Sequence, residues 1–560
     1  MDTGNKLSWF RKHPYASSAL VTAIFAAGLL LLTDAHVAIG DSGDSGPLSN
    51  VPVPTPIGGD IVDQAAAVRL GKALFWDVQV GGDGQTSCGT CHFHGGADNR
   101  TFNTLNPGPD GIFASGGVTG AGQQFHPSNI VNDDRVASQG LVGLKFVGID
   151  PDPHNAADLC TPVVTAPFFD NRRTTTRNAP TTTNGLVFFR QIFLDGRGNQ
   201  IFNGVNPFGQ TANNNAAATN PALTAIGNSP LASQAVGPAN RHPEMGCANG
   251  TGNIGTSGRA FNGPNSLAAK MLARPALQHQ FVHPQDSALG GLSNWPNKGL
   301  RCGDHPCMYG ELISAAFGTN ITNTLTQFSR LFGQAVQAYE STLIPDQTPL
   351  DRFLAGDGRA MTDTQKKGFN IFGGKGQCSK CHAGAELSDA SVSFAARNGL
   401  INEDGGDQGF HNIGVRPPAE DIGRAGTGGA NAVPFSESGS PVDNGAFKTP
   451  ALRNVKFSAP YFHNGGKATL ADVVDFYSRG GDFPNPSKRI KNLDFKSEEK
   501  AALVDFLTNG LTDCRTEREE APFDHPSLTV PNGPDLPATG GGHSCNQSSG
   551  QSSNQNSGRR

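Results

Sequence analysis

The stretch Cys88-Gly89-Thr90-Cys91-His92 has the C-x-x-C-H spacing at which two thiols and an imidazole attach a c-type haem. In such a site the cysteines form thioethers with the haem vinyl groups, and the histidine ligates the iron from one face. The same spacing returns at Cys378-Ser379-Lys380-Cys381-His382, in a chain with only 10 cysteines and 15 histidines. The alternatives are a redox or structural C-x-x-C pair, or a zinc site, which would need a second ligand pair that is not evident. We therefore expect two covalently bound haem c groups.

The composition indicates a globular protein with extensive loops. The chain has 560 residues, of which 16% are charged, with 72 glycines and 38 prolines. Its net charge of -5 is small for this length, which gives no reason to expect a nucleic acid partner.

Residues 1–40 have the layout of an export signal. Lys6, Arg11 and Lys12 precede an apolar run over residues 16–32, as in a signal peptide. The cleavage site after this run is poor, so an uncleaved membrane anchor is the alternative. Either way, the rest of the chain is expected outside the bacterial cytoplasm, where c-type haems are attached. Residues 41–58 are rich in Gly, Ser and Pro and are expected to form a linker.

Hydrophobic periodicity predicts a mainly α-helical protein. Helices are expected over residues 61–74, 323–343 and 497–507, after a capping box at Thr362, and from Thr469 onward. A helix thus precedes each haem motif, which suggests a duplicated cytochrome c-like lobe, with long loops between the elements.

Six cysteines lie outside the haem motifs, and an oxidising compartment would allow them to pair. Their connectivity cannot be deduced from sequence, although Cys302 and Cys307 are the nearest local pair. Residues 516–560 are rich in polar residues, Pro and Gly and are expected to form a disordered tail.

Several blocks over about residues 60–510 together resemble the bacterial di-haem cytochrome c peroxidases and the related MauG enzymes. In chain order they are Leu70-Gly71-Lys72-Ala73-Leu74-Phe75, Arg177-Asn178-Ala179-Pro180-Thr181, Asp195-Gly196-Arg197, Gln234-Ala235-Val236-Gly237-Pro238, Ala338-Tyr339-Glu340-Ser341-Thr342-Leu343, Phe410-His411-Asn412-Ile413-Gly414, Phe447-Lys448-Thr449-Pro450-Ala451-Leu452-Arg453-Asn454-Val455 and Ala459-Pro460-Tyr461-Phe462-His463-Asn464-Gly465. The resemblance implies an N-terminal peroxidatic haem domain over residues 59–320 and a C-terminal electron-transfer cytochrome c domain over residues 321–515.

The resemblance also implies the residues around the first haem. His92 would be the proximal ligand, and Gln234, Pro238 and Glu244 reproduce the spacing of the distal residues. A carboxyl group near the iron can move a proton between the two peroxide oxygens, which is general acid–base catalysis. Gln234 would orient the peroxide by hydrogen bonding, and Pro238 would narrow the pocket.

One departure from the family concerns the distal side of the first haem. Peroxidases of this family carry a histidine a few residues before the Arg-Asn-Ala-Pro block, and the corresponding residue here is Asp170. We therefore expect this iron to be five-coordinate or water-bound, unless a loop brings His126 or His154 to it.

Two further departures concern the second haem. His382 would be its proximal ligand, and the distal methionine of many relatives is replaced by Tyr477, as in MauG-like enzymes. A phenolate favours ferric iron, so the potential should be low. The alternatives are that Tyr477 is a core tyrosine on an apolar stripe, or that His463 is the ligand instead. The tryptophan that bridges the haems in relatives is replaced by Leu194, so Phe193, Trp76 or direct tunnelling would carry the electron.

The family holds a calcium ion between its lobes, and the matching residues are Asn178, Ser458 and Pro460. An amide oxygen and backbone carbonyls are suitable hard donors for Ca²⁺.

The resulting prediction is a periplasmic enzyme, soluble or anchored, that reduces hydrogen peroxide with electrons from a small c-type cytochrome or cupredoxin. One alternative is a MauG-like oxidase that acts on an organic or protein substrate through a high-valent haem. Another is an electron carrier without catalysis, which the Gln234–Glu244 pattern argues against. A homodimer is left open.

Overall fold

Helices form most of the regular structure in the part of the chain that the structure describes. The computed structural model describes residues 46–113, 122, 130, 132–209, 225–248, 258–318, 324–429, 432–486 and 489–541. The α-helices are α1 (Gln64–Trp76), α3 (Pro230–Ala235), α4 (Leu267–Leu272), α5 (Tyr309–Phe317), α6 (Thr324–Glu340), α7 (Pro349–Leu354), α8 (Asp363–Gly373), α9 (Val392–Asn398), α10 (Leu470–Arg479), α11 (Ser497–Asp505) and α12 (Cys514–Glu517). The helices expected from periodicity and capping boxes are thereby confirmed.

The strands are short and pair antiparallel in twos. The pairs are β1 (Leu105–Asn106) with β2 (Arg135–Val136), β3 (Leu144–Gly148) with β4 (Leu159–Pro162), β5 (Arg301–Cys302) with β6 (His305–Pro306), β7 (Phe410–His411) with β10 (Phe447–Lys448), β8 (Thr427–Gly428) with β9 (Val433–Pro434), and β11 (Leu528–Thr529) with β12 (Asp535–Leu536). Such pairs cannot form a core on their own, so the helices and long loops must bury the apolar side chains.

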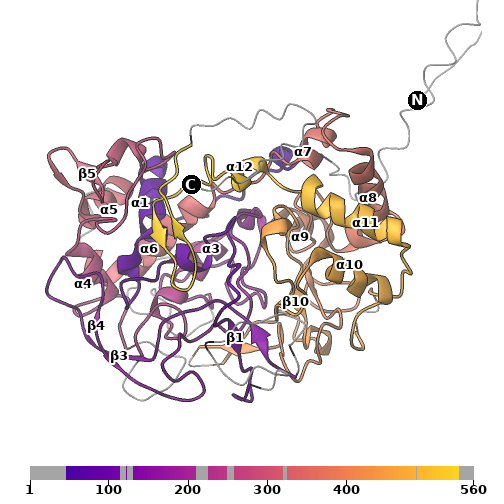
Figure 1. Ribbon diagram of the computed structural model, residues 1–560, viewed down its shortest axis with the longest axis horizontal. Helices are drawn as coiled ribbons and strands as arrows, with labels where there is room; N and C mark the ends of the chain where they lie inside the picture. Colours follow the sequence, from indigo (N-terminus) through magenta and orange to yellow (C-terminus); the bar gives the residue numbers. More distant parts are fainter. Residues whose placement is uncertain are drawn as a thin grey trace, which may run out of the picture. The chain divides into compact units, whose positions relative to one another are not determined.

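The described residues form two principal hydrophobic cores. The first is built by α1, α4, α5 and α6, and the second by α7, α8, α10 and α11. Figure 1 shows α1, α4, α5 and α6 on the left and α8, α10 and α11 on the right. Two cores of this kind agree with the expected duplication.

The same helix contact recurs in both cores. A β-carbon built on Gly71 would lie 1.9 Å from the Ala335 carbonyl oxygen of α6, and one on Gly368 would lie 2.1 Å from the Ala502 carbonyl oxygen of α11. Only glycine permits such a close approach between helices. In each core the helix then brings a phenylalanine against the histidine of the following haem motif. The Phe75–His92 ring centroids are 6.1 Å apart, and the Phe372–His382 centroids are 6.3 Å apart.

The packing of helix α6 crosses the expected boundary between the domains at residues 320 and 321. Helix α6 was assigned to the C-terminal domain, yet Phe328, Phe332 and Val336 lie in the first core against α1. The second core begins at Leu350. The apolar stripe of α6 is complementary to α1, and this contact decides to which core the helix belongs.

The expected disordered tail is wrong for residues 516–541. Phe523, Leu528 and Val530 lie in the first core, and Asp524 accepts a hydrogen bond from the buried Lys72 of α1 at 3.1 Å. The imidazole of His525 stacks on Trp76 with ring centroids 4.7 Å apart. In Figure 1 the strands of this segment, β11 and β12, are yellow and are drawn over the helices of the first core. Burial of a few apolar side chains orders a segment that is polar on average.

The expected linker is also partly packed. Leu48 is 1% exposed and contacts a third cluster around Leu186 and Phe189, and its amide donates to Asp351. Residues 1–45 and 542–560 lie outside the described residues, and so do the expected export signal and the end of the tail. Among the described helices, none is long and apolar enough to cross a membrane.

The predicted Cys302–Cys307 disulfide is confirmed. A second disulfide joins Cys160 to Cys247, and Cys514 is also disulfide-bonded. The four cysteines of the two C-x-x-C-H motifs take part in no disulfide.

Candidate haem sites

The first C-x-x-C-H motif opens onto a cavity in the N-terminal half of the chain. Cys88, Cys91 and His92 line this first cavity. The motif forms a 3₁₀ turn, η3 (Cys88–Cys91), whose Gly89 lies directly against the Trp76 ring, where a β-carbon would be only 2.5 Å away. The glycine therefore allows the turn to pack onto the end of α1.

The donor set of the first cavity fits a covalent haem. The Nδ1 atom of His92 lies 2.9 Å from the Gly96 carbonyl oxygen. A proton on Nδ1 satisfies this contact and leaves Nε2 for an iron atom, which is the usual arrangement of a ligating histidine. Burial lowers the pKa of His92, which favours the neutral, ligating form. Burial raises the pKa of both motif cysteines, that of Cys91 to about 12.

The three predicted distal residues line the same first cavity. Gln234 belongs to α3, Pro238 begins the short helix η6 (Pro238–Asn240), and Glu244 lies in the loop that follows. The Glu244 carboxylate is 13% exposed and lies 3.5 Å from an Arg241 guanidinium nitrogen. A carboxyl group at the edge of a cavity, in contact with a cation at the surface, can exchange protons with solvent.

None of the alternative distal histidines in the described residues reaches this cavity. Asp170 and His154 are exposed, and neither contributes to the lining. Among the described residues, His92 is the one histidine that lines the first cavity. His126 lies outside the described residues.

The second C-x-x-C-H motif opens onto a second cavity. Its lining includes Cys378, Cys381, His382, Tyr477 and His463. Cys378 begins the turn η8 (Cys378–Lys380) and Cys381 follows it. The Nδ1 atom of His382 lies 3.0 Å from the Pro450 carbonyl oxygen. The arrangement repeats that of His92 and also fits a covalent haem.

Tyr477 and His463 are the two candidate second ligands in this second cavity. Burial raises the pKa of Tyr477, which favours the neutral phenol. The His463 ring stacks on Phe447 with centroids 3.7 Å apart, and burial lowers the pKa of His463 to about 3. Both side chains therefore reach the cavity without a charge of their own.

The two cavities share a wall. Asn178, Ala179, Pro180 and Leu194 line both of them. Leu194 thus lies at the wall between the two cavities, at the position for which the family resemblance implies a bridging tryptophan in relatives. Phe193 lines only the first cavity, and Trp76 lines neither, so Trp76 does not lie between them.

Of the predicted calcium residues, Asn178 lies at this shared wall. The Asn178 amide side chain contacts the Pro460 carbonyl oxygen, and Ser458 lines the second cavity. The two ends of an amide exchange places by rotation about one bond. Turned around, the Asn178 amide would present an oxygen beside the Pro460 carbonyl, which is a donor pair suited to Ca²⁺.

Three buried ionisable residues of the cavities were not predicted from sequence. Glu340 lines the first cavity; burial raises its pKa to about 8, and one of its oxygens has no hydrogen-bond partner among the described residues. Lys448 lines the second cavity, where burial lowers its pKa to about 7 and its ammonium lies 3.6 Å from the centre of the Phe189 ring. Both residues stand in blocks quoted for the family resemblance, which is the signal that would have found them.

The third of these residues is His411, which also lines the second cavity. Its Nε2 atom lies 2.7 Å from an Asp389 carboxylate oxygen. Burial opposes protonation, but the charge and the hydrogen bond of Asp389 favour it and raise the pKa of His411. A buried ion pair therefore lies beside the second motif.

A family model described as di-haem cytochrome c peroxidase matches residues 65–359. Among curated proteins, the chain is 36% identical over 196 residues to cytochrome-c peroxidase IdrP2 of Denitromonas iodatirespirans, which is 32% of this chain and 47% of that protein. It is 30% identical over 174 residues to the methylamine utilization protein MauG of Methylorubrum extorquens, which is 31% of this chain and 42% of that protein. The chain thus spans about half the length of the curated relatives it matches.

Two solved structures are similar over most of the chain. A MauG-like protein associated with microbial copper homeostasis is 21% identical with a TM-score of 0.45, covering 85% of this chain and 98% of that chain. The diheme peroxidase BthA from Burkholderia thailandensis is 19% identical with a TM-score of 0.41, covering 84% of this chain and 93% of that chain.

Proposed function

The chain belongs to the di-haem cytochrome c peroxidase family, and on this premise we propose that it is a periplasmic enzyme that reduces hydrogen peroxide to water. The electrons would come from a small c-type cytochrome or a cupredoxin. Cys88, Cys91 and His92 would hold the peroxidatic haem, and Cys378, Cys381 and His382 the electron-transfer haem. The observation that carries the proposal is that Gln234, Pro238 and Glu244 line the same cavity as the first haem motif.

The residues of the first cavity have distinct tasks in this mechanism. A haem bound there would supply the iron that accepts peroxide and passes electrons to it. Glu244 would take a proton from one oxygen of the peroxide and return it to the other, departing oxygen, a transfer that general acid–base catalysis accelerates by about 10²–10⁴. Gln234 donates a hydrogen bond that orients the peroxide, and Pro238 limits the space for other molecules.

Turnover of hydrogen peroxide with reduced cytochrome c tests this function. The haem-loaded protein should oxidise the cytochrome in proportion to added peroxide, and Glu244→Gln should lower kcat by about a hundredfold or more. Asp170→Asn is the matched control, because this carboxylate is exposed and does not line the cavity. Absence of turnover in the wild-type protein would refute the proposal.

A second candidate is a MauG-like oxidase that acts on an organic or protein substrate. Two observations favour it: Tyr477 lines the second cavity, and His92 is the one histidine among the described residues that lines the first. Under this alternative, peroxide is consumed slowly in the presence of reduced cytochrome c, and a long-lived spectral change precedes oxidation of the substrate. Rapid oxidation of the cytochrome favours the peroxidase.

We also propose that Asn178, Ser458 and Pro460 hold a calcium ion at the wall between the cavities. The support is the contact between the Asn178 side chain and the Pro460 carbonyl oxygen. Removal of calcium with a chelator should lower the melting temperature of the wild-type protein. The same treatment should leave Asn178→Ala unchanged, and an equal effect on both proteins would contradict the site.

A further inference from the structure

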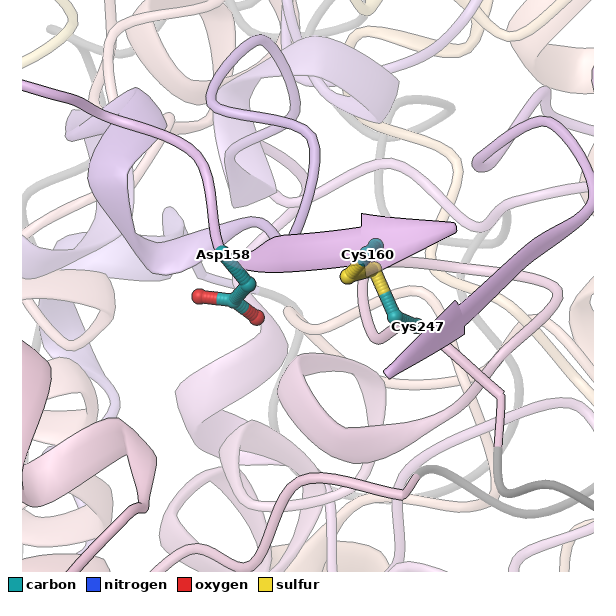
Figure 2. A group of neighbouring side chains, drawn as sticks. All are labelled: Asp158, Cys160 and Cys247. Atoms are coloured by element: carbon teal, nitrogen blue, oxygen red, sulfur yellow. A yellow bond between two sulfur atoms is a disulfide. The ribbon is translucent and has the colours of Figure 1, made fainter. Parts of the chain in front are cut away.

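The Cys160–Cys247 disulfide ties the loop that carries Glu244 to β4. Cys160 is a residue of β4, and Cys247 follows Glu244 by three residues in a loop without regular structure. Figure 2 shows the disulfide between the two segments, with Asp158 beside it. The two cysteines are 87 residues apart in the sequence, so the crosslink joins segments that are distant along the chain.

Backbone hydrogen bonds hold both sides of the same loop. The Gly82 amide donates to the Met245 carbonyl oxygen at 2.7 Å. On the other side of Cys247, the Ala248 amide donates to Leu144 at 2.7 Å, and the Phe146 amide donates to Ala248 at 2.8 Å. The loop therefore lies between β3 and the segment that leads to the first haem motif. The disulfide is the covalent member of this set.

A buried cluster of charged side chains lies beside the disulfide. The Asp158 carboxylate lies 3.0 Å from Arg259 and 2.8 Å from Lys270, and all three side chains have no exposed surface. Arg259 also donates to the Ala239 carbonyl oxygen at 2.7 Å, next to Pro238, and Lys270 donates to the Gly81 carbonyl oxygen at 2.9 Å. The cluster thus fixes the main chain on both sides of the distal wall.

The surroundings of the disulfide also suit its reduction. The Asp158 carboxylate and the two sulfur atoms lie within 4.8 Å of one another. The Asp158 carboxylate is itself paired with Arg259 and Lys270, so its negative charge beside the disulfide is compensated. Cys160 is partly exposed, whereas Cys247 is fully buried, so a dithiol can attack the sulfur of Cys160 and release that of Cys247.

We propose that the Cys160–Cys247 disulfide positions Glu244 at the first cavity, and that reduction of this disulfide by a dithiol lowers the rate of peroxide reduction there. This inference rests on the proposed function. In the reaction the dithiol is oxidised to its own disulfide, and two electrons and two protons pass to the sulfur atoms. The Cys160–Cys247 bond breaks, and both residues become thiols. The haem thioethers are not cleaved by a dithiol, so the cofactor stays attached.

The test compares two double variants of the haem-loaded protein. Cys160→Ser with Cys247→Ser removes the proposed crosslink, and Cys302→Ser with Cys307→Ser removes the disulfide of the β5–β6 hairpin, which does not line the first cavity. Hydrogen exchange over residues 238–248 should be at least about tenfold faster in the first variant only. Its kcat with peroxide should fall about 10- to 100-fold, because a displaced general acid–base loses its effect.

A chemical version of the test avoids any folding defect of the variants. The wild-type protein is treated with dithiothreitol, alkylated and desalted, and its iron is reoxidised with ferricyanide. Mass spectrometry should find Cys160 and Cys247 alkylated while both haems remain bound. The affinity of the ferric protein for cyanide should then be the same in the treated wild-type protein and in treated Glu244→Gln, whereas the two untreated proteins should differ. Unchanged hydrogen exchange and cyanide binding after loss of the crosslink would overturn the inference. Lack of peroxide turnover in the untreated wild-type protein would instead refute the proposed function, because exchange and cyanide binding are measured without turnover.

Discussion

Replacing Asp421 by Asn should weaken the contact between the N-terminal and C-terminal halves of the protein. The Asp421 carboxylate accepts hydrogen bonds from Arg177 at 2.8 and 2.6 Å and lies 3.2 Å from Arg135. Arg177 lines the first cavity and also pairs with Asp195. The Asp421 side chain is 5% exposed, so the solvent screens these charges little.

The size of the effect follows from the pKa of Asp421. Burial alone would raise this pKa, but the hydrogen bonds and charge of Arg177 outweigh it and lower the pKa to about 2. Relative to an unfolded value of roughly 3.9, this difference amounts to about 2.5 kcal/mol of folding free energy at neutral pH. Because the folded pKa is the lower one, the stabilisation is complete above about pH 4 and is lost as the pH falls towards 2.

Chemical denaturation of the haem-loaded protein at pH 6 and pH 2.5 measures this contribution. Asp421→Asn should lower the free energy of unfolding by about 2–3 kcal/mol at pH 6 and by less than about 1 kcal/mol at pH 2.5. Glu517→Gln is the control, because the Lys456–Glu517 pair at 2.6 Å is 33% and 50% exposed and should contribute less than about 1 kcal/mol at either pH. An equal loss for Asp421→Asn at both pH values would refute the electrostatic argument.

Three further predictions address the helix contact and the cavities. Gly71→Ala should destabilise the protein by about 1–3 kcal/mol in thermal unfolding, because its β-carbon would collide with Ala335, whereas Gly310→Ala, with nothing within 4 Å, should not. Burial raises the pKa of Glu340 to about 8, so the melting temperature of the wild-type protein should fall as the pH rises from about 4 to 8. In Glu340→Gln this fall should be absent, and an unchanged slope would contradict the prediction. Tyr477→Phe should change the low-spin absorption spectrum of the second haem and raise its potential if the phenolate ligates the iron, and an identical spectrum would exclude that ligand.

Local chemistry determined much of what could be predicted from the sequence. The spacing of two thiols and an imidazole identifies each haem motif within five residues, and helix caps such as Thr362 and Thr469 act over three residues. The Cys302–Cys307 disulfide closes a hairpin and is likewise local. The family blocks added Gln234, Pro238 and Glu244, which line one cavity with the first motif.

Only the tertiary structure decided the contacts between distant segments. The stripe on α6 shows that the helix has a buried face, but not that the face meets α1 rather than the second core. Residues 516–541 have the composition of a tail, yet Phe523 and Val530 find an apolar surface on the first core. Composition averages over a segment, whereas burial depends on a few side chains and on what they meet.

The same reason applies to the site. That Leu194 lies in both cavities, that Glu340 is buried in one of them, and that Cys247 pairs with Cys160 all depend on segments many residues apart. A sequence states which residue types are present and how they repeat, and this is enough to identify a motif whose atoms all lie within one turn. Distances between turns are set by the packing of the whole chain, so the surroundings of Cys88-Gly89-Thr90-Cys91-His92 were decided by the fold.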